Sequence, residues 1–215
     1  MLVKKSILFD LDGTLTDSGE GIMNCAELAL RHFSIPVPSR ERLREFVGPP
    51  LNETFLRYGV PEEKIQEAID VYRSRYLPIG KYENTPYPGI RELLDTLKKD
   101  GFGLYVATSK PEATSMDILA HFDLARFFDR ICGATMDLSR TSKEAVIAYL
   151  LEQLGRDGTM VMVGDTKFDV LGASALGIPT IGVSWGYGSV SDMENAGAAA
   201  IAHTVEELLT LLRAI

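Results

Sequence analysis

Short, continuously apolar runs that recur along the chain constrain its fold more than any other feature. Runs without polar alternation are typical of β-strands buried on both faces. They are Ser6–Phe9, Gly103–Ala107, Met160–Val163, Ile178–Val183 and Ala199–Ala202, with Ile131–Ala134 a weaker member. Stretches of helical periodicity separate these runs from residue 88 onward. We therefore predict an α/β fold, with a doubly wound, Rossmann-like parallel sheet covered by helices on both faces.

Two of the intervening segments carry clear helix signals. Ile90–Lys99 places its leucines on one face, as expected of a helix packed against a sheet. A later helix is predicted to begin with a capping box that pairs Thr141 with Glu144. It is expected to end near Leu154, with Gly155 as the glycine that follows its C-terminus.

Residues 17–85 differ from the rest of the chain because they contain no convincing strand. The segment is too long for a simple crossover and too helical for a loop. One helix is predicted to follow Ser18 as its cap, and another to begin with Pro61 as its first residue. We therefore predict a core of residues 1–16 and 86–215, interrupted by an all-helical domain over residues 17–85.

Charge and composition exclude several classes of protein. The 215 residues include 30 acidic and 22 basic side chains, for a net charge of −8, which argues against a nucleic-acid binder. No apolar run approaches the roughly 20 residues that span a bilayer, and no signal peptide opens the sequence. Cys25 and Cys132 are predicted to be buried free thiols. We expect a soluble cytoplasmic protein, monomeric or weakly dimeric, with neither nucleic-acid nor membrane partners.

Carboxylates follow the predicted strands where a ligand site is expected. Asp10 and Asp12 end the first strand, and Gly13 permits a turn that could bring both to one crevice. Thr108 and Asp165 follow two other strands, and the carboxyl ends of parallel strands meet at one edge. Converging carboxylates repel each other unless a hard cation lies among them. Oxygen ligands without a nearby histidine favour Mg²⁺ over zinc.

Each of these residues taken alone also has a structural explanation. Asp165, Asp169 or Thr108 could cap a helix, but their combination with Asp10 and Asp12 at equivalent strand ends favours a site.

A cation is also expected at this edge. Lys143 lies in the first turn of a predicted helix, where the helix dipole disfavours a positive charge. We therefore predict that Lys143 reaches the crevice and neutralises an anion there. Lys110 and Lys167 remain alternatives within the same clusters, although their side chains could point to water.

With these motifs the sequence resembles the haloacid dehalogenase superfamily, in its phosphoglycolate phosphatase-like branch. The resemblance covers essentially the whole chain, including the closing stretch from Gly182 to Gly188. It implies a phosphatase whose residues 17–85 form a helical cap that closes over the site. The motifs are, in order, Asp10-Leu11-Asp12-Gly13-Thr14, Thr108, Lys143 and Gly164-Asp165 through Asp169.

The resemblance also implies a role for each motif residue. Asp10 would attack phosphorus to form an aspartyl-phosphate, and Asp12 would act as the general acid and base. Mg²⁺ would be held by Asp10, Asp165 and the backbone carbonyl of Asp12. The remaining site residues would bind or support the substrate phosphate: Thr108, Ser109 and Lys143 as phosphate ligands, and Asp169 in orienting Lys143 or a metal-bound water.

Two alternatives remain open. Sugar-phosphate mutases resemble this branch closely, but they usually carry a cap histidine and lysine that handle a bisphosphate, and His32 lies well down an apolar helix. Receiver domains gather similar residues around Mg²⁺ but have no inserted helical domain.

The substrate would be a small phosphate ester, with phosphoglycolate, nucleoside monophosphates and pyrophosphate all open. The third motif departs from the family, because Glu144 rather than proline follows Lys143. Within the cap, Val47-Gly48-Pro49-Pro50 is either a substrate loop or an ordinary turn between helices. Arg44, Arg75 and Lys81-Tyr82 could contact a leaving group or simply be solvated.

Overall fold

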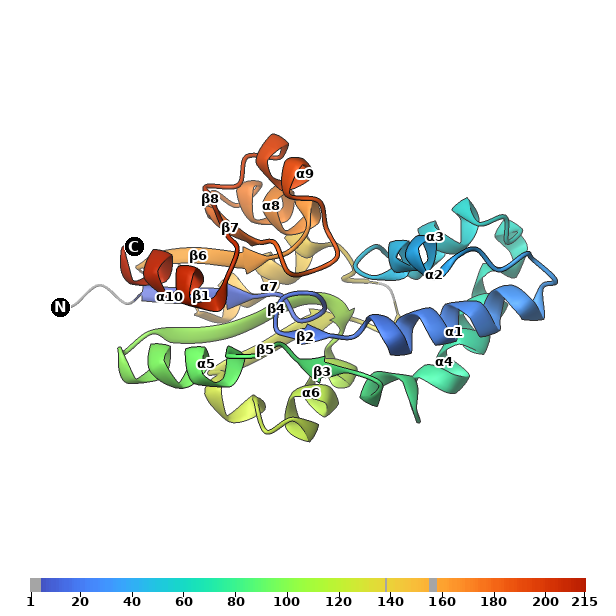
Figure 1. Cartoon of the computed structure of the whole chain (residues 1–215), viewed down its shortest axis with the longest axis horizontal. Coiled ribbons are helices and arrows are strands. Elements are labelled where there is room, and N and C mark those ends of the chain that lie inside the picture. The colour runs from blue at the N-terminus through green and yellow to red at the C-terminus, as the bar shows by residue number, and fades with distance from the viewer. Residues whose placement is uncertain (1–4, 138, 155–157) are drawn as a thin grey trace. The chain divides into compact units, whose positions relative to one another are not determined.

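The computed structural model describes residues 5–137, 139–154 and 158–215 (Figure 1). The chain divides into two compact units, one formed by Met1–Thr16 with Pro86–Ile215 and the other by Asp17–Thr85. The chain passes between the units at β2 (Thr16–Asp17) and β3 (Thr85–Pro86), which pair as a two-stranded sheet.

The first unit is built on a parallel sheet, which confirms the predicted fold class. Six strands of the described residues form it, in the order β5-β4-β1-β6-β7-β8. The chain starts at the centre with β1, builds outward on one side, and then crosses to the other, as in doubly wound sheets. All the predicted strands are present, as β1 (Lys5–Phe9), β4 (Gly103–Pro111), β5 (Arg130–Ala134), β6 (Thr159–Gly164), β7 (Thr180–Val183) and β8 (Ala200–Ala202).

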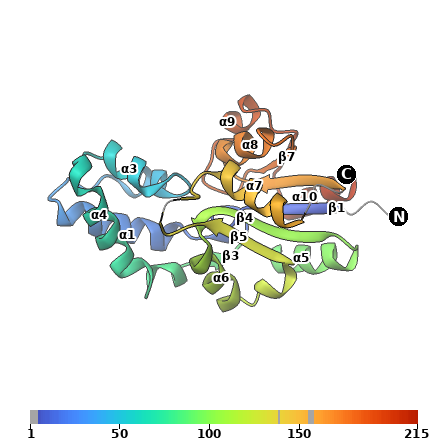
Figure 2. The same ribbon diagram turned by 180° about the vertical axis from the view of Figure 1, so that it is seen from behind.

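Two apolar cores lie on the two faces of this sheet. Ile7 and Phe9 of β1 belong to the core that also contains α5, α6 and α10, while Leu8 belongs to the core that contains α7 and α8. Because neighbouring residues of one strand enter opposite cores, the strand must be apolar throughout. Helices cover both faces of the sheet (Figures 1 and 2). The helices are α5 (Ile90–Lys99), α6 (Glu112–His121), α7 (Lys143–Leu154), α8 (Lys167–Ser174), α9 (Val190–Asn195) and α10 (Val205–Arg213).

The second unit is helical, as predicted, and has its own core. Its helices are α1 (Gly19–His32), α2 (Arg40–Leu43), α3 (Leu51–Arg57) and α4 (Ile65–Tyr76). The buried faces of α1 and α4 provide much of this core, including Ile22, Ala26 and Ile69. Tyr72 and Tyr76 stack with ring centroids 5.2 Å apart on the inner face of α4.

Helix starts are where the sequence predictions were wrong. The hydroxyl of Ser142, not Thr141, caps α7, since it accepts a hydrogen bond from the Ala145 amide at 3.1 Å. Pro61 does not begin α4, because a 3-10 turn over Glu62–Lys64 separates it from the helix. Ser18 does precede α1, but its hydroxyl makes no capping hydrogen bond. The predicted role of Gly155 lies outside the described residues.

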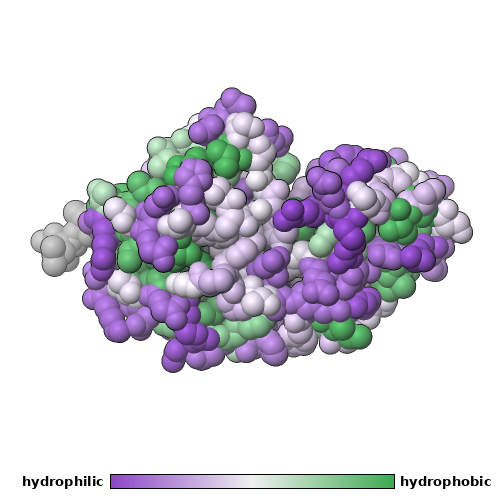
Figure 3. Space-filling view, in the orientation of Figure 1, coloured by the Kyte–Doolittle hydropathy of each residue, from purple (hydrophilic) through white to green (hydrophobic). Residues whose placement is uncertain are grey.

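Both cysteines are buried free thiols, as predicted for Cys25 and Cys132. The face drawn in Figure 3 is mainly hydrophilic, with hydrophobic residues in separate patches. In the described part of the chain, no helix combines the length and the apolar character needed to cross a membrane.

Candidate active site

Asp10 and Asp165 lie at the point where the order of the strands reverses. Asp10 directly follows β1, and its backbone N–H donates to the Val163 carbonyl of β6 at 2.9 Å. Asp165 directly follows β6. In doubly wound sheets the crevice beyond this reversal is where ligands bind, so the fold places both carboxylates at a ligand position.

Lys143 forms ion pairs with both Asp10 and Asp169. Its ammonium lies 2.8 Å from Oδ1 of Asp10 and 2.8 Å from Oδ1 of Asp169, and it donates to the Ala107 carbonyl at 3.0 Å. All three charged side chains are buried. The helix dipole disfavours a positive charge in the first turn of α7. The two carboxylates compensate the charge of Lys143 at this position.

Asp169 contacts both the start of α8 and the Lys143 ammonium. As a residue of the first turn of α8, it accepts from the Thr166 amide at 3.0 Å and the Thr166 hydroxyl at 2.8 Å, both on Oδ2. Its other oxygen faces Lys143. The helix start thus fixes the orientation of a carboxylate that contacts the site lysine.

Asp165 is enclosed by loops from both ends of the first unit. Oδ2 accepts from the Tyr187 amide at 2.8 Å, and Oδ1 accepts from the Thr14 hydroxyl at 3.2 Å. A Cβ at Gly13, which has a φ of 81°, or at Gly186 would collide with this carboxylate. Glycine is required at both positions because the backbone approaches Asp165 so closely.

The buried carboxylates have the arrangement of a cation site. Asp10, Asp165 and Asp169 each offer an oxygen, and these oxygens lie within 4.8 Å of one another. Lys143 balances only one of the three negative charges that the cluster carries when ionised. Buried charge must be compensated, so the donor set fits a divalent cation that takes oxygen ligands.

Burial governs the protonation of these carboxyl groups. It raises the pKa of Asp10 to about 6, against the lowering effect of the Lys143 ammonium and with a further increase from Asp169. Burial also raises the pKa of Asp165 well above its usual value, together with the charges of Asp169 and Asp10. Burial disfavours the Lys143 ammonium, but the two carboxylates outweigh it and raise the pKa of Lys143.

These shifts predict how the stability of the metal-free protein depends on pH. The pKa of Asp10 rises from 3.8 to about 6 on folding, so its contribution is fully present below pH 3.8 and is lost as the pH rises through about 6. We expect Asp10 to lower the free energy of unfolding by up to about 3 kcal/mol over this window. Urea unfolding in EDTA between pH 4 and 8, compared with Asp10→Asn, isolates this contribution. Identical pH profiles for the two proteins would contradict it.

Asp12 lies beside Lys110 rather than in the three-carboxylate cluster. The Lys110 ammonium is 2.6 Å from Oδ2 of Asp12, and the Lys110 amide donates to the Thr108 hydroxyl at 3.2 Å. Thr108 is buried and its hydroxyl lowers the pKa of Asp10, while Ser109 is half-buried. The structure therefore brings every predicted site residue to the same edge of the sheet, as two linked groups.

Lys110 is the site residue whose position sequence reasoning missed. Its side chain is buried against Asp12 and does not point to water. Lys167, the other alternative, is half exposed and pairs with Asp192 at 3.3 Å. The Tyr187 amide was also missed, although Gly186 and Gly188 after a strand signalled a close backbone approach there.

His32 and Arg75, singled out in the second unit, have partners within it. His32 ends α1 and lies 2.9 Å from Glu67 at the surface. Arg75 forms two hydrogen bonds of 2.7 Å with Glu83, so its guanidinium is already engaged. The Val47–Pro50 segment lies between a 3-10 turn and α3.

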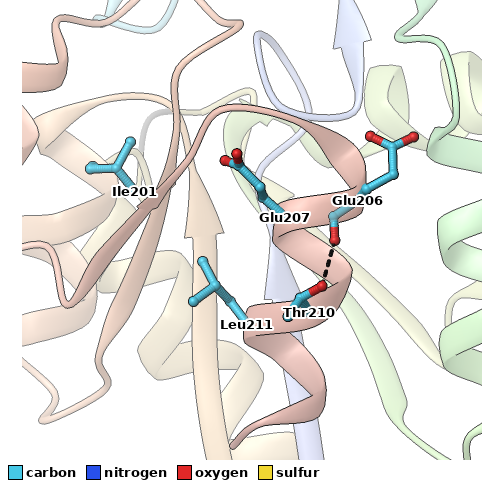
Figure 4. Close-up of a pocket in the computed structure, with 5 residues that line it drawn as sticks. All are labelled: Ile201, Glu206, Glu207, Thr210 and Leu211. Carbon is cyan, nitrogen blue, oxygen red and sulfur yellow. Dashed lines mark hydrogen bonds between the residues drawn. The ribbon is translucent and has the colours of Figure 1, made fainter.

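A surface pocket of the first unit is lined by none of the three clustered aspartates. It is formed by β8 and α10 (Figure 4), where the Thr210 hydroxyl donates to the Glu206 carbonyl at 2.9 Å. Its lining residues are Ile201, Glu206, Glu207, Thr210 and Leu211, none of them a predicted site residue.

Comparison with known proteins finds similarity along nearly the whole chain. A family model described as haloacid dehalogenase-like hydrolase matches residues 7–183. A 5'-nucleotidase of Pseudomonas aeruginosa is 44% identical over 87% of this chain and 86% of its own. A tyrosine-protein kinase, PtkA, of Mycobacterium tuberculosis is 43% identical over 94% of this chain and 70% of its own. The crystal structure of a predicted phosphatase from Clostridium acetobutylicum is 43% identical, with a TM-score of 0.94 and complete coverage of both chains.

Proposed function

The chain belongs to the haloacid dehalogenase-like hydrolases and is a phosphatase of that family. From this premise we propose that it hydrolyses small-molecule phosphate monoesters through an aspartyl-phosphate on Asp10. The observation that carries the proposal is the buried cluster in which the Asp10 carboxylate lies 2.8 Å from the Lys143 ammonium. A carboxylate held beside a cation can approach an anionic phosphate, which an isolated carboxylate would repel.

In the first step, an oxygen of Asp10 attacks phosphorus and forms a new P–O bond. The bond between phosphorus and the ester oxygen breaks, and its electron pair leaves with that oxygen. Asp12 in its acid form gives the leaving oxygen a proton, so the products are an alcohol and the acyl phosphate of Asp10. Lys143 and Thr108 stabilise charge on the phosphoryl oxygens.

In the second step, water replaces the aspartyl group. Asp12, now a carboxylate, takes a proton from a water molecule whose oxygen attacks phosphorus. The P–O bond to Asp10 breaks, and its electron pair returns to the carboxylate. Inorganic phosphate is released, and Asp12 is again in its acid form, ready for another ester.

We further propose that Asp10, Asp165 and Asp169, with the Asp12 carbonyl, provide the surroundings of a Mg²⁺ ion. When bound, the ion would supply positive charge that lessens the repulsion between the nucleophile and the phosphate. Three mutually close carboxylate oxygens, of whose charges one ammonium compensates only one, support this assignment.

Nucleoside 5'-monophosphates are the substrate class we propose to test first. The 5'-nucleotidase of P. aeruginosa supports this choice through 44% identity over most of both chains. Phosphoglycolate and pyrophosphate complete the panel. In this proposal residues 17–85 form the cap domain that selects among these esters and excludes water from the site.

Metal dependence gives the direct test of the proposed chemistry. We expect p-nitrophenyl phosphate turnover to require Mg²⁺ and to stop in excess EDTA, with inorganic phosphate as a product. Mg²⁺ at about 100 times its dissociation constant should also raise the free energy of unfolding by about 3 kcal/mol, because only the folded state assembles the site.

Asp165→Asn separates metal binding from a general salt effect. It keeps the size of a buried side chain that contacts Tyr187 and Thr14, but it removes one charge from the cluster. The variant should lose most of the Mg²⁺-dependent stabilisation, whereas Asp100→Asn, at a surface ion pair with Arg213, should keep it. Equal responses of wild type and Asp165→Asn would show that the ion binds elsewhere.

Phosphoryl transfer to protein tyrosine is a second candidate function. One observation favours it, the 43% identity to the tyrosine-protein kinase PtkA over 94% of this chain. Incubation with labelled ATP and a tyrosine-containing peptide distinguishes the two functions, since a phosphatase releases inorganic phosphate and a kinase labels the peptide.

A further inference from the structure

Strand β4 is irregular at the point where it reaches the site. Its pairing with β5 is regular up to Thr108 opposite Gly133, and the register then shifts before Pro111 opposite Ala134. Gly133 makes room for this irregularity, because a Cβ there would collide with the Lys110 carbonyl and the backbone of Glu112. Bulges of this kind change the direction of a side chain and are frequent beside active sites.

Lys110 lies within this irregular segment and forms a buried ion pair with Asp12. The Lys110 ammonium and Oδ2 of Asp12 are 2.6 Å apart, with only 6% and 11% of the two side chains exposed. Two buried opposite charges at this distance stabilise each other, and removing one leaves the other charge buried and uncompensated. The pair therefore fixes the position of the Asp12 carboxylate.

The two oxygens of Asp12 are in different situations. Oδ2 is held by Lys110, whereas Oδ1 is buried and has no hydrogen-bond partner among the described residues. A proton donor and acceptor needs one oxygen free for the reacting group and benefits when the other is fixed. The hydrogen-bond pattern around Asp12 meets both conditions.

We propose that Lys110 is a positioning residue for proton transfer by Asp12, separate from the phosphate-binding cation Lys143. The inference rests on the proposed function, in which Asp12 protonates the oxygen of the leaving group. Lys110 acts through Asp12: it holds Oδ2 and thereby presents Oδ1 to the ester oxygen as the P–O bond breaks.

Leaving groups of different basicity test this role. Nitrophenolate departs as a stable anion, but an alkoxide must receive a proton as it leaves. We would measure kcat/KM, because it reports the steps up to departure of the leaving group. One substrate is p-nitrophenyl phosphate. The other is either phosphoglycolate or a nucleoside 5'-monophosphate, whichever the wild type hydrolyses faster. Lys110→Met should lose about 10- to 100-fold with the alkyl ester and less than about threefold with the nitrophenyl ester.

The ratio of the two kcat/KM values makes the test independent of folding yield. Both substrates are measured on one preparation, so the folded fraction cancels. Lys110→Arg, which keeps a cation, should hold the ratio nearer to wild type than Lys110→Met. Lys98→Met is the matched control, because it removes a surface ion pair of 2.7 Å with Asp129 at the opposite end of β4 and should leave the ratio unchanged.

Three outcomes would overturn the inference. Equal losses with both esters, which leave the ratio unchanged, would show that Lys110 binds the phosphoryl group or serves the fold alone, and wild-type kcat/KM values with both esters in Lys110→Met would show that Asp12 needs no positioning. If Asp12→Asn itself lost both esters equally, Asp12 would not be the acid. The first two results leave the proposed phosphatase function intact, whereas a wild type that hydrolyses no ester overturns both.

Discussion

Asp10→Asn is expected to abolish turnover, with kcat for p-nitrophenyl phosphate falling by at least about 10⁴-fold. The amide has the shape of the carboxylate but cannot act as the nucleophile, and no other carboxylate takes its place beside both Lys143 and Thr108 in the described structure. Steady-state kinetics at saturating Mg²⁺ measures the loss.

Folding of this variant must be checked independently. Since burial makes the ionised Asp10 unfavourable, the neutral amide should leave the protein folded, with a circular dichroism spectrum like that of wild type. Asp100→Asn provides the same chemical change at a surface residue of the first unit and should keep full activity. If Asp10→Asn retained a tenth of the wild-type rate, Asp10 would not be the nucleophile.

Lys143→Met is expected to have the second-largest effect, and it should affect both activity and stability. Removal of the ammonium leaves Asp10 and Asp169 without their shared cation, 2.8 Å from each. Breaking such a buried pair costs about 3–5 kcal/mol. Activity should fall by about 10²- to 10³-fold, because one fixed positive charge no longer faces the phosphate.

Urea unfolding with and without Mg²⁺ separates the two contributions. In EDTA the full destabilisation of Lys143→Met should be seen, while Mg²⁺ should restore part of the stability by supplying positive charge to the same carboxylates. Lys98→Met, at a partly exposed pair, should cost at most about 1 kcal/mol. A loss below 1 kcal/mol for Lys143→Met in EDTA would mean that the ion pairs contribute little.

The sheet could be predicted from the sequence because its signal is local. A strand that serves two cores must be apolar throughout, and each such run became a strand of the sheet. Helix starts were less predictable, because adjacent residues compete for the same role. Thr141 and Ser142 can both cap a helix, and in the structure the Ser142 hydroxyl accepts the capping hydrogen bond.

The candidate site was predictable for the residues that follow strands directly. Asp10 and Asp165 needed only the strand ends and the parallel topology. The position of Lys110 could not be predicted in this way. Lys110 lies in an irregular part of β4 whose backbone passes so close to Gly133, on another strand, that a Cβ there would collide with the Lys110 carbonyl, and no local pattern around Lys110 encodes that contact.

The central place of β1 also determines the order in which the first unit can assemble on the ribosome. Phe9 pairs with Val106 on one side and Val163 on the other, so the first strand to be synthesised must wait for both partners. The contiguous helical segment 17–85 emerges before either of them and can complete its own contacts first. Until β6 is made, the strand that ends in Asp10 has an unpaired edge, and the carboxylate is not yet buried. The buried carboxylate cluster therefore forms only after β6 has been made, long after Asp10 itself has been synthesised.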